Sequence, residues 1–305
     1  MLQNKIVNSE MTSKEILVMK LRMWQMEINE GLKRKRFKVP VHLGLGTESL
    51  VVAVSSIVLH DDNLVLTHRN AAFNLVRASS QRQVVMEYEL NEHGTSFGQL
   101  GSMNLSNPDA GVVYSSSILG NNISVACGFA FAQQMSGCDA ITVVLTGDGA
   151  IEEGAFYEGL VFAKSHNLPL VVVVDNNDYS MASAISQRRC DIDLEHFCKA
   201  VGVAYYKLSG NDVEAYGNEF SQLSKDTRKI HSQSVVEVFT TLLNQHAGPT
   251  PGWPSDPFRV DFSGGLVIRK DISDPVFVLR EKYGHDIFAS IESEILATQS
   301  FMDQQ

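Results

Sequence analysis

Cysteine is scarce in this chain of 305 residues, and its four copies are scattered. They are Cys127, Cys138, Cys190 and Cys198, and no two of them form a C-x-x-C pair. This spacing excludes the common zinc-binding and dithiol redox motifs. The sequence therefore predicts reduced thiols, which are typical of a cytoplasmic protein.

Long apolar runs and an excess of basic charge are also absent. No apolar stretch approaches the ~20 residues that span a bilayer, and the polar N-terminus lacks a signal-peptide apolar region. Acidic residues outnumber Lys and Arg by 35 to 25, which argues against nucleic-acid binding. The basic cluster from Lys33 to Lys38 favours a solvated helix end over a phosphate-binding patch. We expect a cytoplasmic protein that binds neither membrane nor nucleic acid.

The remaining composition is that of a folded protein, with 44% hydrophobic and 20% charged residues. No internal repeat and no linker interrupts it. We expect a single domain over residues 1–305, with an N-terminal helical arm over about 1–40 and a C-terminal helical tail over about 275–305.

The centre of the chain indicates alternating strands and helices. Residues 141–146 and 170–174 are β-branched runs without polar alternation, as expected for strands covered on both faces. Residues 151–166 between them have helical apolar spacing, and 234–240 predicts a further strand. Strand, helix and strand at this spacing form a βαβ unit, so the fold class is α/β with a mostly parallel sheet.

Glycine and proline place the helices and loops around this centre. A helix is expected over 12–31 with Thr12 or Ser13 as its N-cap, a second after the glycine turns of 44–59, and a helical C-terminus over 275–298. The glycine-, serine- and asparagine-rich stretch 93–107 fits either a loop close to a ligand or a plain surface loop.

Polar residues follow two of the predicted strands at the point where each ends. Gly147-Asp148-Gly149 follows the first, and Asn176-Asn177 follows the second, about thirty residues later. In parallel sheets, ligands bind beyond these strand ends, and a helix N-terminus there favours a phosphate. Asp148 would repel a phosphate unless a cation lay between them. Mg²⁺ prefers oxygen ligands and commonly bridges protein groups to phosphates, so the pattern predicts Mg²⁺ and a diphosphate.

This stretch resembles the thiamine diphosphate motif, GDG followed by NN, of the α subunit of the E1 component of 2-oxo acid dehydrogenases. The likeness extends over about residues 12–298, through GTESLVVAV, HRNAAFNLVR, GSMN, ILGNNISVACGFAFA and DPVFVLREKYG. It implies the three-layer, doubly wound thiamine diphosphate-binding fold of the transketolase-like superfamily. Some features also resemble the N-terminal half of transketolases.

The resemblance implies a role for each matching position. Asp148, Asn177 and the Tyr179 carbonyl would hold Mg²⁺. Contacts to thiamine diphosphate would come from backbone or side-chain groups of Arg69, Ser117, Leu119, Gly149 and Ala150.

Several positions depart from the family pattern, chiefly on the substrate side. His68 stands where these dehydrogenases have tyrosine, and Asn104 replaces a histidine. The proline-rich stretch 246–257 only loosely matches the family's histidine loop, so His246 is either an active-site residue or an ordinary loop histidine. His68 and His246 are the candidate catalytic residues.

Activation of the cofactor in this family needs a glutamate from a second, pyrimidine-binding domain that the chain does not resemble. The resemblance therefore implies a β subunit that supplies this glutamate, in an α2β2 assembly, with a 2-oxo acid substrate and a lipoyl acyl carrier as acceptor. Two alternatives remain: half of a split transketolase-like ketol transferase, and a non-catalytic cofactor-binding regulatory subunit. The sequence does not name the 2-oxo acid or the acceptor.

Overall fold

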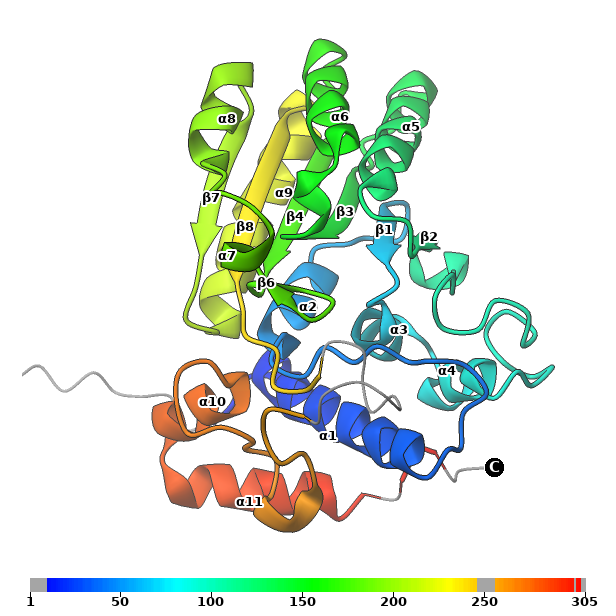
Figure 1. The fold of residues 1–305 in the computed structure, drawn as a ribbon, viewed down its shortest axis with the longest axis vertical. Coiled ribbons are helices and arrows are strands. Elements are labelled where there is room, and N and C mark those ends of the chain that lie inside the picture. Colours follow the sequence, from blue (N-terminus) through cyan, green and yellow to red (C-terminus); the bar gives the residue numbers. More distant parts are fainter. Residues whose placement is uncertain (1–9, 246–255, 299, 303–305) are drawn as a thin grey trace, which may run out of the picture.

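The computed structural model describes residues 10–245, 256–298 and 300–302. In these residues the chain builds one large sheet in which every strand pairing is parallel (Figure 1). Its six strands, in spatial order, are β2 (Val112–Ser116), β1 (Asn63–Thr67), β3 (Thr142–Gly147), β4 (Leu170–Asn176), β8 (Gln233–Phe239) and β7 (Ala204–Leu208). A separate antiparallel hairpin joins β5 (Tyr179–Ser180) and β6 (Ser183–Ala184).

Helices cover both faces of the sheet and so form three layers (Figure 1). One face carries α5 (Asn121–Ser136), α6 (Gly154–Ser165) and α8 (Leu194–Val201). The larger hydrophobic core, on the other face of the sheet, is built with α1 (Ser13–Lys33), α2 (Glu48–Ser55), α3 (Ala71–Arg77), α4 (Gln81–Tyr88), α9 (Val213–Ile230), α10 (Pro275–Tyr283) and α11 (His285–Leu296). The shorter elements are η1 (Pro108–Ala110), η2 (Ala150–Glu152), α7 (Ile185–Arg188) and η3 (Phe262–Gly264).

Side chains alternate between the two cores along each central strand. In β3, Val143 belongs to the core under α2 and α9, whereas Val144 belongs to the core under α5 and α6. Val171 and Val172 of β4 divide in the same way, and all four are fully buried. The strands lack polar alternation because neither face meets water. The predicted α/β class with a doubly wound, mostly parallel sheet is confirmed.

The strand and helix predictions hold at the centre and need correction at two ends. The helix expected from Ile151 starts as the 3-10 turn η2, and α6 itself begins at Gly154, after Glu153 adopts an extended conformation. The C-terminal stretch forms two helices because Gly284, at φ +79°, ends α10 before α11 starts. The single domain with a terminal arm and tail stays a prediction, and α1, α10 and α11 pack together in the larger core.

A buried ion-pair cluster ties these terminal helices together. Arg22 of α1 is fully buried and contacts Glu48 of α2 and Asp274, the N-cap of α10. Its Nη1 also donates to the Leu266 carbonyl oxygen at 2.9 Å. Every guanidinium nitrogen is thereby paired, which such a deeply buried charge requires. Across the described ranges, no helix combines the length and apolar character needed to cross a membrane.

Candidate active site at the strand ends

A pocket opens beyond the carboxyl ends of the central strands, facing α2 and α3. The chain runs outward from β1 to β2 and later from β3 to β4 in the opposite direction, so the order of strands reverses between β1 and β3. Ligand-binding crevices of open α/β sheets lie at such reversals. The pocket is lined by residues that follow β1, β2, β3 and β4, together with residues of α2.

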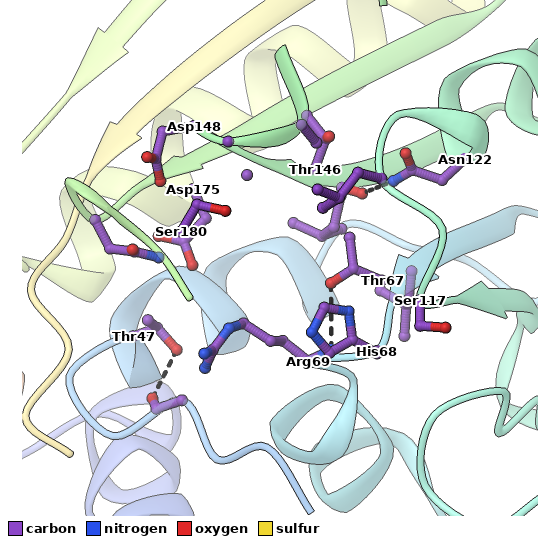
Figure 2. Close-up of a pocket in the computed structure, with 18 of the residues that line it drawn as sticks. Thr47, Thr67, His68, Arg69, Ser117, Asn122, Thr146, Asp148, Asp175 and Ser180 are labelled. Carbon is purple, nitrogen blue, oxygen red and sulfur yellow. Dashed lines mark hydrogen bonds between the residues drawn. The ribbon is translucent and has the colours of Figure 1, made fainter. Parts of the chain in front are cut away.

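Two carboxylates occupy the β3 and β4 side of the pocket (Figure 2). Asp148 follows β3, and Asp175 lies near the end of β4. Both contact Asn177, whose backbone hydrogen-bonds to Asp148 and whose side chain hydrogen-bonds to Asp175. The Thr240 hydroxyl also donates to Asp175 at 2.5 Å. The strand ends therefore bring together two acids and an amide.

Asp148 is far less exposed than its place in a turn suggests. Its side chain is 1% exposed, although Asp148 lines the pocket. Burial raises the pKa of Asp148 to about 6, and its ion pair with Arg188 counteracts part of that rise. The carboxylate thus depends on a nearby cation to hold its charge.

A cationic and histidine-rich side faces the two acids (Figure 2). Arg69 follows β1, and its Nη1 donates to the Leu43 carbonyl oxygen at 3.0 Å. Burial lowers the pKa of Arg69 to about 10, against the opposing effect of Asp175 and Asp148, so the guanidinium stays charged at neutral pH. Arg69 is therefore placed to meet an anion that enters the pocket.

His68 stands beside Arg69 and contacts a second histidine that the sequence analysis missed. The rings of His42 and His68 are 4.8 Å apart, edge to face at 89°. Burial, with help from Arg69, lowers the pKa of His68 to about 4. Burial also lowers that of His42 to about 3, with contributions from His68 and Arg69. Both imidazoles are thus neutral at neutral pH. In the part of the chain that the structure describes, the buried Nδ1 of His42 has no hydrogen-bond partner.

The hairpin of β5 and β6 lies across the GDG turn. A side chain at Gly149 would collide with the Ser180 side chain, so only glycine fits under the hairpin. From α7, directly after the hairpin, Arg188 reaches back to Asp148 with Nη2 at 2.5 Å and also pairs with Glu152. The turn is consequently enclosed by residues that follow it in the sequence.

The structure places nine of the ten predicted site residues along this one pocket. They are His68, Arg69, Ser117, Leu119, Asp148, Gly149, Ala150, Asn177 and Tyr179. Their individual roles stay predictions. The tenth residue, His246, lies outside the described residues.

Three residues in or next to the site were not predicted from the sequence. Asp175 directly precedes Asn176, so the argument from strand ends could have found it. His42 and Arg188 reach the site only through tertiary packing, and nothing in their local sequence signals it.

The glycine-rich stretch 93–107 does not line the pocket. Its backbone instead surrounds the buried Glu87 of α4, whose carboxylate accepts hydrogen bonds from the backbone N–H groups of Ser96, Gly98, Leu100 and Gly101 at 2.8–3.0 Å. The two interpretations of this stretch, a loop close to a ligand and a plain surface loop, both stay predictions. Its connection to the site is indirect, through a hydrogen bond from Asn70 to the Ser102 carbonyl.

Comparison with known proteins identifies relatives of the whole pocket-bearing region. Residues 17–249 match the model of the family described as dehydrogenase E1 component. The chain is 28% identical over 210 residues to the pyruvate dehydrogenase E1 component subunit alpha of Rickettsia prowazekii (strain Madrid E), which covers 69% of this chain and 64% of that protein. It is 31% identical over 233 residues to the mitochondrial pyruvate dehydrogenase E1 component subunit alpha of Saccharomyces cerevisiae, covering 76% and 54%. The chain thus spans between half and two thirds of these relatives' length.

Solved structures match the fold. The transketolase of Campylobacter jejuni aligns with a TM-score of 0.60 at 18% identity, covering 96% of this chain and 47% of that one. The transketolase of Leishmania mexicana aligns with a TM-score of 0.60 at 17% identity, covering 94% and 46%. These likenesses establish the transketolase-like fold, while the sequence match over the strands and the pocket establishes the family. The chain belongs to the dehydrogenase E1 component family.

Proposed function

We propose that this chain is the α subunit of a thiamine diphosphate- and Mg²⁺-dependent enzyme that decarboxylates a 2-oxo acid and transfers the resulting acyl unit. The observation that carries the proposal is the pocket between β1 and β3, where Asp148 faces Arg69 across the strand ends (Figure 2) and Asn177 also lines the wall. The names of the relatives, pyruvate dehydrogenase E1 component subunit alpha, support the same reaction class.

The donor set fits Mg²⁺. Asp148 offers a carboxylate oxygen, Asn177 an amide oxygen and Tyr179 a backbone carbonyl, and Mg²⁺ prefers such oxygen ligands. Among the described residues, no group of three or more His, Cys, Asp or Glu side chains could hold a metal. A site with a single carboxylate suits a cation that is bound mainly through the phosphates of its ligand.

Other residues of the pocket fit the diphosphate and the aminopyrimidine of the cofactor. Gly149 and Ala150 would offer backbone N–H groups to the diphosphate, and Arg69 supplies a positive charge. Within the described residues, the buried Thr146 hydroxyl has no hydrogen-bond partner, although Thr146 lines the pocket. Ser117 and Leu119 form an exposed rim against which the aminopyrimidine would lie.

When bound, thiamine diphosphate supplies the carbon nucleophile and the electron sink that decarboxylation needs. The chain's own residues bind and orient the reactants around it. Arg69 would attract the anionic diphosphate, while His68, neutral at neutral pH, would exchange a hydrogen bond or proton with the substrate. His246 stays a second candidate for that proton transfer.

A partner subunit is part of the proposal. In the described pocket the only carboxylates are Asp148 and Asp175, both at strand ends, so the activating glutamate would come from a β subunit. Large apolar side chains are exposed at the mouth: Ile118 is 68% exposed and Leu119 47%. A covering surface would shield them and exclude water from the reaction. We propose an α2β2 assembly because two-fold symmetry is the commonest closed arrangement.

The test compares the isolated chain with a co-purified complex. Each is supplied with Mg²⁺ and thiamine diphosphate, and decarboxylation of pyruvate and other 2-oxo acids is followed with an artificial electron acceptor. We expect turnover only from the complex. Sustained turnover by the isolated chain would contradict the partner requirement. Turnover of a ketose phosphate instead of a 2-oxo acid would favour the ketol transferase, and cofactor binding without turnover would favour a regulatory subunit.

A further inference from the structure

Arg188 uses all three of its guanidinium nitrogens to fasten the hairpin segment over the candidate metal ligand. Its Nε donates to the Ser183 carbonyl oxygen at 3.1 Å, within its own segment. Its Nη1 pairs with Glu152, and its Nη2 pairs with Asp148 at 2.5 Å. The Arg188 side chain is only 13% exposed, so little solvent screens these pairs.

The Asp148 carboxylate therefore has two cationic partners, the Arg188 guanidinium and the proposed Mg²⁺. Asp148 is the single acid in the proposed Mg²⁺ ligand set, and its Oδ2 atom accepts the Arg188 contact. A divalent cation on that carboxylate would lie next to the guanidinium, and the two positive charges would repel each other strongly in a site this buried. Binding of the metal and the Arg188–Asp148 pair thus oppose one another.

Arg188 has a second carboxylate with which it can pair when the metal binds Asp148. Glu152 already contacts Arg188, and its side chain is 29% exposed, so it keeps contact with water. The neighbouring Arg189 also pairs with Glu152, at 3.1 Å, and in the described part of the chain no ion pair joins it to Asp148. A shift of Arg188 away from Asp148 would therefore leave neither a buried bare charge on the arginine nor an unpaired acid beneath the metal.

The segment that carries Arg188 is small and rests on the GDG turn. It runs through β5, β6 and α7, with left-handed backbone at Asp178 (φ 68°) and Met181 (φ 55°). Ser180 of this segment packs directly against Gly149. Movement of Arg188 is consequently coupled to the lining of the diphosphate end of the pocket.

We propose that Arg188 is an internal cation that competes with the divalent metal for Asp148, so that loading of metal and cofactor displaces Arg188 and loosens the segment 183–188, which follows the proposed metal ligand Tyr179 in the chain. The inference rests on the proposed function. It assigns Arg188 to control of metal affinity, beyond a structural ion pair.

Binding of Mn²⁺ to the full-length chain, in saturating thiamine diphosphate, tests the inference. Free Mn²⁺ is measured by its electron paramagnetic resonance signal for the wild type, Arg188→Gln and Arg189→Gln. We expect Arg188→Gln to lower the apparent Kd for Mn²⁺ by about tenfold, the equivalent of ~1.4 kcal/mol. Arg189→Gln, which removes a neighbouring charge of similar burial, should leave the Kd nearly unchanged.

Hydrogen exchange provides the second measurement. Peptides that cover 183–188 should exchange faster in the wild type once Mn²⁺ and thiamine diphosphate are added, and Arg188→Gln should show fast exchange from the start. Equal or weaker Mn²⁺ binding by Arg188→Gln than by the wild type would overturn the inference while leaving the proposed function intact. Failure of the wild type and of both variants to bind would contradict the proposed function, and the inference with it.

Discussion

Arg22 and Glu48 form a two-point ion pair with no exposure to solvent, in which Nε lies 2.7 Å from Oε1 and Nη2 lies 3.0 Å from Oε2. The pair fastens α1 to α2. Glu48 also accepts a hydrogen bond from the Gly46 backbone at 2.9 Å. Only glycine fits at position 46, because its φ is +104° and a Cβ there would collide with the Thr241 carbonyl oxygen. The G-x-E stretch is therefore structural, since Glu48 is turned away from the pocket and into the core.

Loss of one carboxylate from this cluster should destabilise the fold. Asp274→Ala removes the N-cap of α10 and leaves the Arg22 charge partly unpaired. Removing one partner of a buried ion pair typically costs ~3–5 kcal/mol in free energy of unfolding. Urea denaturation of the purified wild type and variant measures this difference in the free energy of unfolding.

Asp212→Ala is the matched control for Asp274→Ala. Asp212 caps α9 in the same way, but its side chain is 44% exposed. Loss of a cap alone costs about 0.5–2 kcal/mol. Equal losses in both variants would show that the buried pairing adds nothing to the cap.

Removal of the charge at Asp148 should abolish metal-dependent cofactor binding. Asp148→Asn keeps the shape of the side chain and eliminates the only anion in the proposed ligand set. We expect calorimetric affinity for thiamine diphosphate with Mg²⁺ to fall by more than ~100-fold, because groups that merely orient a metal ligand contribute ~10–100-fold. Asp178→Asn, an exposed acid close to Asn177 in the sequence, should bind like the wild type. Unchanged affinity in Asp148→Asn would refute the ligand assignment.

His68 should affect turnover more than binding. If it exchanges a proton with the substrate, His68→Gln should lower kcat by ~10²–10⁴-fold while cofactor affinity stays the same. His42→Gln should have a smaller effect, because His42 contacts His68 and does not line the pocket. A change below about threefold in His68→Gln would return this residue to a packing role.

The histidine pair should make stability fall in mild acid. The pKa values of His68 and His42 are lowered to about 4 and 3, below their ordinary value of 6.5. Between pH 6.5 and 4 the unfolded chain therefore binds more protons than the folded chain, so stability decreases as the pH falls through this window. His68→Asn should flatten the decrease, whereas His93→Asn, at a side chain that is 75% exposed, should not. Identical pH slopes for all three proteins would rule out the lowered pKa.

The centre of the fold could be predicted because its signals are local. Fully buried parallel strands need apolar residues on both faces, so Thr142–Gly147 and Leu170–Asn176 stand out as β-branched runs. The edge strand β7 has mostly exposed or half-exposed side chains, and its sequence lacks that signal. The helices α3, α4, α8 and α9 likewise escaped the sequence analysis.

The site residues also divide into those with a local sequence signal and those without one. Asp148 and Asn177 were predictable because strand ends in a parallel sheet meet at one edge, and the spacing of the two strands is written in the sequence. The contact of Arg188 with Asp148 depends on how a hairpin folds back over the turn, across 40 residues of chain. Likewise, the approach of His42 to His68 depends on how the segment between α1 and α2 packs against the residues that follow β1. Such contacts form only when segments distant in the sequence pack together, and no local sequence pattern predicts them.

The four backbone hydrogen bonds that the Glu87 carboxylate accepts have a consequence for the order of folding. The donors lie only 9–14 residues further along the chain, so the loop can close on α4 by local diffusion. Closing a loop of about ten residues takes ~10–100 ns, far less than long-range pairing of parallel strands. We therefore expect residues 94–101, which contain no helix or strand, to become ordered early in folding. They would pack against α4 before the strands of the sheet pair.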